Sequence, residues 1–245
     1  MGLTALFYPW GVVLQALAII HFVRRRPDNY WIWIILIGGG VGALVYIVAE
    51  VLPDVNLVVG SLEHFSRRRR IRLLEQLILD NPAIGNQEEL ADLYLEENKF
   101  ARARELYDKV IASARSDSLD PFYRRGIAEL GLDDFQAARV DLDYVVAKDP
   151  KYDFHRAIGL LAHAHSRGGD PVQADALFKR ATDISTLSET YYNYASFLEG
   201  QRRTGEAREW AERILAKKPT MPRYLRRRER PWFRKASVLL KRVKG

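Results

Sequence analysis

Apolar residues follow two patterns along this chain. Residues 1–51 are almost continuously apolar, whereas from residue 71 onward apolar side chains recur every three or four positions. The second spacing places side chains on one face of an α-helix, because a helix turns once in about 3.6 residues. The two patterns predict an all-α protein whose first part differs in kind from the rest.

The first part contains two long uncharged runs. Residues 3–23 carry no charge except a possible proton on His21, and residues 30–49 carry none. A run of about 20 residues at about 1.5 Å each matches the roughly 30 Å hydrocarbon core of a bilayer. We therefore predict a transmembrane hairpin over 1–51, with spans at about 3–23 and 30–51. The first run lacks a basic start and a small-x-small cleavage site, so it is not read as a signal peptide.

The glycine-rich stretch 38–42 has two possible readings. A phosphate-binding loop would need a preceding strand and a following Lys or helix N-terminus, and the sequence has neither. Gly38 and Gly42 instead lie four residues apart on one helical face, which suits close helix–helix packing in a membrane and a possible oligomer contact.

Residues 24–70 combine a basic turn, Arg24–Arg26, the span WIWIILIGGGVGALVYIVAE and a second basic run, Arg67–Arg70. This segment resembles the N-terminal membrane hairpin of phospholipase-D-type cardiolipin synthases, and the resemblance implies an anchor. The catalytic HxK motifs of that family are missing, since none of the five histidines has Lys two positions later. Only the anchor would be shared, not the lipid chemistry.

The rest of the chain repeats. The small residues Ala91, Gly126, Ala162 and Ala195 are separated by 35, 36 and 33 positions, and each is followed by a similar series of aromatic, small and apolar positions. This pattern resembles the tetratricopeptide repeat (TPR), whose unit is two antiparallel helices of about 34 residues. The resemblance implies an α-solenoid of about four repeats over 86–219. Residues 52–82 would form a connector and capping half-repeat, and residues 220–245 a basic tail or capping helix.

Charge is distributed unevenly. Residues 73–216 have a net charge of −8, residues 217–245 of +11 and residues 1–72 of +4, which total the +7 of the chain. The tail suggests contact with anionic lipid, with nucleic acid, or with the acidic repeats of the same chain. All three roles stay open, with nucleic acid the least favoured. The tail residues concerned are Arg226, Arg227, Arg228, Arg230, Arg234 and Lys235.

Catalytic and metal-binding motifs are missing. The chain has no Cys, no GxSxG, no HExxH and no Walker loop. His163 and His165 are two positions apart and would point in different directions on a helix. We expect no enzyme activity, no metal and no cofactor.

The TPR resemblance implies that the first helix of each repeat lines a concave binding surface. Carried over by position, the surface residues are Glu88, Asp92, Leu95, Tyr123, Ile127, Leu130, Arg156, His163, Ser166, Tyr192, Ser196 and Glu199. Members that bind peptide carboxylates use Lys and Asn there. Asp92, Tyr123 and Ile127 differ from that pattern and favour a ligand with basic and apolar side chains.

These features predict a membrane-anchored TPR adaptor for protein partners, in assembly or quality control of membrane or envelope proteins. The alternative is a permanent structural subunit of a membrane complex. Both place the chain in a membrane as an integral protein, with the bacterial inner membrane expected. The orientation stays open, because the basic runs at Arg24–Arg26 and Arg67–Arg70 favour opposite topologies.

Overall fold

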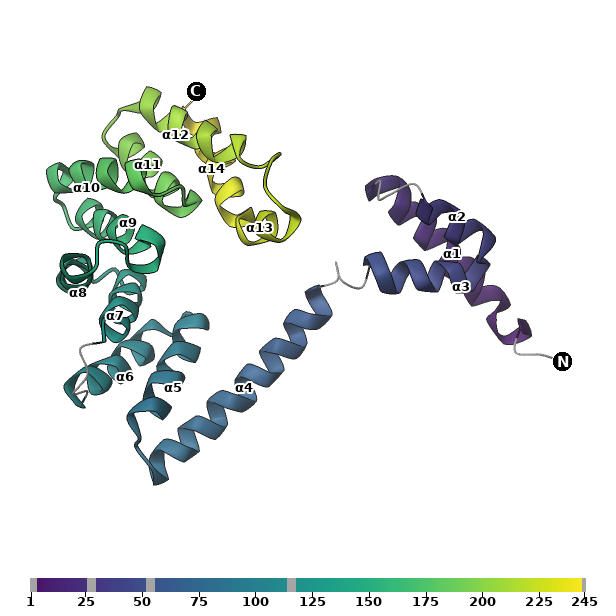
Figure 1. Ribbon diagram of the computed structural model, residues 1–245, viewed down its shortest axis with the longest axis horizontal. Helices are drawn as coiled ribbons and strands as arrows, with labels where there is room; N and C mark the ends of the chain where they lie inside the picture. The colour runs from purple at the N-terminus through teal and green to yellow at the C-terminus, as the bar shows by residue number, and fades with distance from the viewer. Residues whose placement is uncertain (1–3, 26–29, 52–55, 114–117, 244–245) are drawn as a thin grey trace. The chain divides into compact units, whose positions relative to one another are not determined.

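The computed structural model describes residues 4–25, 30–51, 56–113 and 118–243, and every regular element in these ranges is helical (Figure 1). The all-α prediction is confirmed. The chain divides into two compact units, Met1–Arg70 and Ile71–Gly245.

The N-terminal unit combines one long helix with three short ones. These are α1 (Thr4–Arg25), α2 (Tyr30–Ile37), α3 (Gly39–Tyr46) and a π-helix (Ile47–Val51), followed by the start of α4 (Asn56–Asp80). Its small core contains Ala18, Trp31, Ile35, Ala43 and Tyr46. Two polar side chains of α1 are satisfied inside the unit. Gln15 Nε2 donates to the Ile35 carbonyl at 2.9 Å, and His21 Nδ1 lies 2.9 Å from the Tyr46 hydroxyl.

The helix predicted over 30–51 is broken at its glycines. Gly39 has a φ of +56°, a left-handed conformation that glycine adopts without a Cβ clash. A Cβ at Gly42 would lie 2.0 Å from the Ile34 carbonyl oxygen, and one at Gly38 would lie 2.7 Å from Gly42 Cα. The glycines therefore allow the chain to fold closely on itself between α2 and α3.

This break changes the interpretation of the N-terminal unit. In the described ranges no helix is both long enough and apolar enough to cross a bilayer. The second predicted span is divided into two α-helices of eight residues and a π-helix of five residues, and α1 carries Gln15 and His21 within its apolar run. The prediction of an integral membrane protein is wrong. The turn expected between the two spans, residues 26–29, lies outside the described residues.

The outer surface of the N-terminal unit is nonetheless strongly apolar. Large side chains that are more than half exposed include Trp10, Trp33, Ile37 and Val41, with Ile37 at 83%. These side chains come from α1, α2 and α3, so each of the three helices leaves apolar surface exposed.

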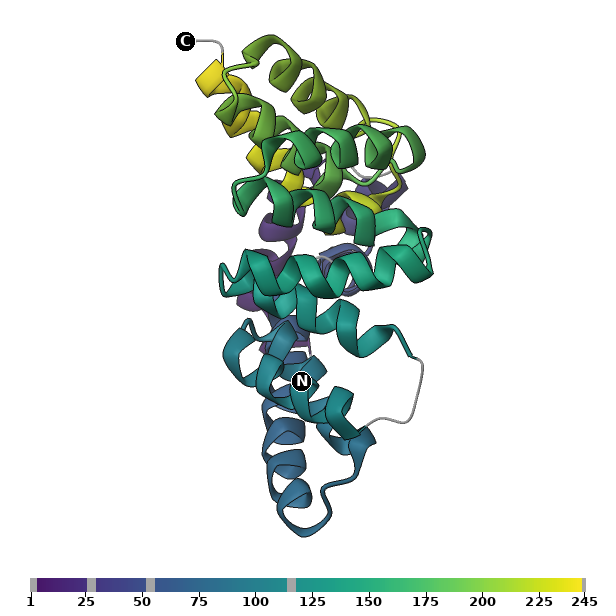
Figure 2. The ribbon, with the colours of Figure 1, turned by 90° about the vertical axis from the view of Figure 1, so that its left-hand side faces the viewer.

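The second unit is a stack of antiparallel helix pairs (Figures 1 and 2). The pairs are α5 (Ile84–Glu96) with α6 (Phe100–Ser113), α7 (Asp120–Gly131) with α8 (Phe135–Lys148), α9 (Tyr152–Arg167) with α10 (Pro171–Ile184), and α11 (Ser188–Gly200) with α12 (Thr204–Ala216). In Figure 1 the first helix of each pair lies on the inner side of a curve. We call the side formed by α5, α7, α9 and α11 the concave face.

Each pair is closed by the same kind of turn. Asn98, Asp133, Gly169 and Arg202 all have positive φ, between 57° and 85°, and are separated by the repeat intervals of 35, 36 and 33. The following helix begins in two repeats with an Asp cap, where Asp134 accepts from Ala137 N–H and Asp170 from Gln173 N–H. The equivalent small residues Ala91, Gly126, Ala162 and Ala195 are all buried where paired helices approach.

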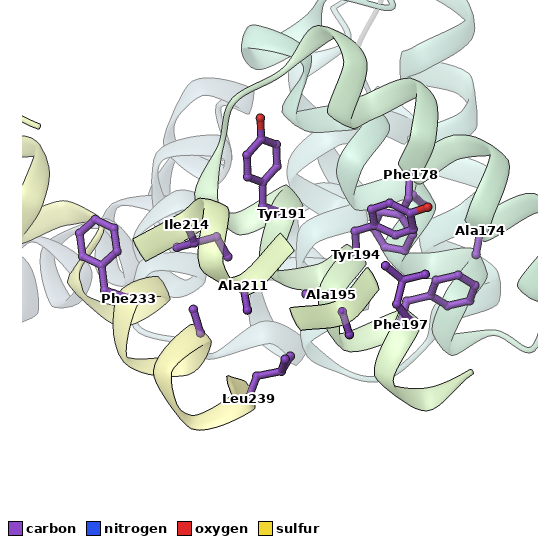
Figure 3. Packing of buried hydrophobic residues seen from close by; sticks show 14 residues of the cluster. Ala174, Phe178, Tyr191, Tyr194, Ala195, Phe197, Ala211, Ile214, Phe233 and Leu239 are labelled. Carbon is purple, nitrogen blue, oxygen red and sulfur yellow. The ribbon is translucent and has the colours of Figure 1, made fainter. Parts of the chain in front are cut away.

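Further helices cover the stack at both ends. At the start, Ile71 and Leu74 of α4 join the core of the first repeat, and the Tyr94 hydroxyl donates to Glu75. At the end, α13 (Arg223–Arg228) leads into α14 (Arg230–Val243). Phe233, Ala236 and Leu239 of α14 are buried in the cluster that contains Ala211 and Ile214 of α12. Figure 3 shows Phe233 and Leu239 in this cluster.

Candidate functional site

The predicted surface residues lie along the four helices of the concave face. Tyr123 is buried at 5% exposure, and the other eleven are half-buried, so they are accessible yet held by neighbours. Their helices are α5 for Glu88, Asp92 and Leu95, α7 for Tyr123, Ile127 and Leu130, α9 for Arg156, His163 and Ser166, and α11 for Tyr192, Ser196 and Glu199.

A cavity of about 510 Å³ opens on this face between α5, α7 and α9. Its lining consists of Leu95, Glu96, Asp120, Tyr123, Arg124, Ile127, Tyr152, Asp153 and Arg156. The structure thus brings four of the predicted residues together, from three different repeats. Five lining residues were not predicted. Asp120 and Arg124 lie on the same face of α7 as Tyr123 and Ile127, three or four positions away from them. This helical spacing could have added both residues to the predicted surface.

One half of the cavity is organised around Arg124. Its guanidinium donates to Asp120 Oδ2 at 2.5 Å and lies 3.3 Å from Asp92 Oδ1. Each carboxylate also accepts from a tyrosine: Asp120 from Tyr152 at 2.8 Å and Asp92 from Tyr107 at 2.5 Å. These bonds connect three successive repeats.

The other half is organised around Arg156. Its Nε and Nη2 donate to the two oxygens of Glu189 at 2.5 and 3.2 Å, and Nη1 donates to the Tyr123 hydroxyl at 3.1 Å. Tyr123 in turn donates to Asp153 at 2.5 Å. Burial raises the pKa of the Tyr123 phenol, so it stays protonated and available as a donor.

Asp153 is held by unusual backbone. Asp153, Phe154 and His155 have φ values of 48°, 53° and 65° at the start of α9, a left-handed turn without glycine. Non-glycine residues in this region cost on the order of 1 kcal/mol each or more. The turn directs the Asp153 carboxylate to Tyr123. Phe154, which follows the cavity-lining residue Asp153 in the sequence, is 85% exposed.

Toward the fourth repeat the concave face contacts the C-terminal helix. Tyr192 lies 5.8 Å from the ring of Trp232 and under Lys235, and Arg242 forms an ion pair with Glu199 at 3.0 Å. His163 is half-buried, and burial lowers its pKa to about 4, so it is neutral at physiological pH. The open part of the face is therefore concentrated in the first three repeats.

The remaining predicted residues lie elsewhere. The six basic residues of the tail are exposed on α13 and α14, while α14 packs through its apolar side on the repeats. Gly38 and Gly42 approach each other in the N-terminal unit. Within the part of the chain that the structure describes, no group of three His, Asp or Glu side chains is arranged to hold a metal ion.

Comparison with known proteins gives no sequence relative. No protein-family model matches the chain, and no curated protein matches its sequence. The resemblance of residues 24–70 to cardiolipin synthases therefore gains no support.

Solved structures do resemble it. The crystal structure of MamA is 20% identical with a TM-score of 0.52, covering 61% of this chain and 87% of MamA. A tetratricopeptide repeat protein from Parabacteroides merdae is 14% identical with a TM-score of 0.53, covering 96% and 84%. The chain has a TPR-like fold.

A third structure bears on binding. YrrB, described as a TPR protein with an unusual peptide-binding site, is 16% identical with a TM-score of 0.50, covering 65% of this chain and 81% of YrrB. Identities this low show only the shared TPR-like fold, which hosts different functions in different proteins. The function must therefore be argued from the concave face itself.

Proposed function

We propose that this protein is a scaffold that holds a protein partner on its concave face. The observation that supports the proposal is the cavity between α5, α7 and α9, which combines apolar, aromatic and charged side chains on a face built by three repeats. A concave surface of this mixed character suits a peptide or an exposed segment of another protein. The TPR-like fold and the peptide-binding description of YrrB agree with this role.

We propose a binding role and not a catalytic one. The tyrosines, arginines and carboxylates of the cavity bond to one another and fix the positions of α5, α7 and α9. This rigid, preorganised surface favours reversible holding of a partner, as in assembly or quality control of other proteins. The alternative is a permanent structural subunit. Purification at low and high salt separates the two, since an adaptor loses its partner or varies in stoichiometry, whereas a subunit keeps a fixed ratio.

Site-specific photo-crosslinking tests the proposal directly. A photoreactive amino acid at Ile127 would sit in the cavity lining, while the same group at Val140, which is 71% exposed on α8, would sit outside it. We expect a crosslinked partner from position 127 and none from position 140 in living cells. Crosslinks from position 140 alone would place the binding surface on the other side and overturn the proposal.

A further inference from the structure

The cavity carries an excess of negative charge. Glu96, Asp120 and Asp153 line it together with Arg124 and Arg156. Two further carboxylates, Glu88 and Asp92 of α5, are close enough to interact electrostatically with Asp120. The positive side chains at the cavity are thus outnumbered.

Neither arginine is available to a ligand without breaking bonds. Arg124 is shared between Asp120 and Asp92, and Arg156 between Glu189 and Asp153, with the last contact at 3.5 Å. Each guanidinium carries one positive charge and faces two carboxylates. An anionic ligand would have to displace these carboxylates, whereas a cation would add the missing charge.

Glu88 shows the imbalance most clearly. It forms no ion pair with a described residue, and burial together with the charges of Asp120 and Asp92 raises its pKa. Burial also raises the pKa of Asp92, with Asp120 adding to the effect and Tyr107 and Arg124 opposing it. A ligand cation beside α5 would relieve this repulsion.

The apolar part of the lining suits the rest of such a ligand. Leu95 and Ile127 are half-buried, and the rings of Tyr123 and Tyr152 lie 4.9 Å apart. The aliphatic stem of Lys or Arg packs well on apolar and aromatic surface while its charged end reaches carboxylates. A volume of about 510 Å³ exceeds one side chain and accommodates two neighbouring ones.

Building on the proposed function, we propose that this cavity recognises a basic residue, Lys or Arg, next to an apolar residue in a peptide segment of the partner. The cation lies near Glu88, Asp92 and Asp120. The apolar neighbour packs on Leu95 and Ile127. The charge complementarity of the cavity carries this choice of ligand, and the bound arginines exclude an acidic peptide.

Peptide binding to the full-length protein tests the inference. Labelled short peptides that differ only in a central pair, Lys-Leu, Glu-Leu or Lys-Ser, are compared by fluorescence anisotropy at low and moderate salt. We expect Lys-Leu to bind about tenfold more tightly than either of the others, as for a charged hydrogen bond plus one buried apolar side chain. Added salt should weaken the Lys-Leu peptide most.

Glu88→Gln isolates the charge, because Glu88 forms no ion pair with the residues that the structure describes and Arg124 interacts with it only electrostatically. We expect it to weaken Lys-Leu binding several-fold, and Glu88→Lys to weaken it further. Glu105→Gln changes an exposed glutamate on α6, away from the cavity lining, and should leave binding unchanged. Thermal melts followed by circular dichroism confirm that all three variants are folded.

The outcomes separate this inference from the proposed function. If Glu-Leu binds as well as Lys-Leu and both crosslink to position 127, the charge selectivity is refuted while the concave face remains the binding surface. If the Glu88→Gln variant binds the Lys-Leu peptide as tightly as the unaltered protein does, the charge selectivity is also refuted. If neither the peptides nor a cellular partner crosslinks to position 127, both proposals fail.

Discussion

Glu129 carries a destabilising charge inside the second repeat. It lies on α7 with its side chain 7% exposed, and its Oε2 has no hydrogen-bond partner. Arg125 is 3.9 Å away but donates to Asp141 at 2.6 and 2.7 Å. Burial and the neighbouring Asp141 charge raise the pKa of Glu129 from 4.5 to about 7.

The size of the effect follows from this shift. The folded protein binds the proton of Glu129 more tightly than the unfolded chain does, so stability falls as pH rises from about 4.5 to about 7 and stays low above. At roughly 1.4 kcal/mol per pH unit, the loss reaches about 3 kcal/mol at most. Glu129→Gln removes the charge but keeps a buried amide, and we expect a gain of about 1–2 kcal/mol at pH 8.

Urea unfolding followed by circular dichroism measures the difference. At pH 8 Glu129→Gln should be more stable than the unaltered protein, whereas at pH 4.5, where Glu129 is protonated, the two should agree closely. Other titrating groups are common to both proteins and cancel in the comparison. Equal destabilisation of Glu129→Gln at both pH values would refute the reasoning, because it would show that a bond made by Glu129 in either protonation state stabilises the fold.

Three further predictions concern packing. Gly159→Ala should destabilise the protein by about 1–3 kcal/mol, because its Cβ would lie 2.6 Å from Thr190 Oγ1, while Gly85→Ala in open space on α5 should stabilise it by about 0.5 kcal/mol. Leu239→Ala should lower the free energy of unfolding by about 3 kcal/mol, because Leu239 is fully buried, whereas Val238→Ala should lower it by less than about 0.5 kcal/mol, because Val238 is 56% exposed. Equal losses in the two variants would argue against the packing of α14. Gly42→Ala should disrupt the N-terminal unit, seen as faster hydrogen exchange in α2 and α3; unchanged exchange would contradict the break between them.

The repeats were predictable because their signal is local. Helical spacing, small residues at fixed intervals and turn residues between them specify helix pairs regardless of tertiary context. The left-handed turn positions were less visible, since Asn98, Asp133 and Arg202 occupy the position that Gly169 occupies in the third repeat. Backbone hydrogen bonds close these turns, as from Lys99 N–H to the Tyr94 carbonyl at 2.8 Å, and Asn and Asp tolerate left-handed backbone better than most residues.

The cavity could be predicted only in part. Tyr123 and Ile127 follow from the position of the first helices, but the bonds from Tyr152 to Asp120 and from Tyr123 to Asp153 join residues 30 or more positions apart. The turn at Asp153 was not predictable, because Asp and His tolerate left-handed backbone better than most residues but Phe154 does not, and three such residues in a row are rare.

The N-terminal prediction failed for a physical reason. An apolar run indicates that its side chains avoid water. It does not indicate whether the run forms one continuous helix. The close approach of Ile34 and Gly42 depends on backbone geometry that hydropathy does not contain.

The position of α14 also determines how long this solenoid can be. Phe233, Ala236 and Leu239 occupy the surface of α12 on which another repeat would have to stack. A fifth repeat added after residue 243 would therefore meet the outer side of α14, where Arg234, Lys235 and Lys241 are exposed and Val238 offers little apolar surface to join. If the same repeat were inserted between α12 and α13, α14 would pack on the apolar surface of the inserted repeat instead of on α12. The stack can therefore be lengthened by insertion before α13 but not by addition after α14.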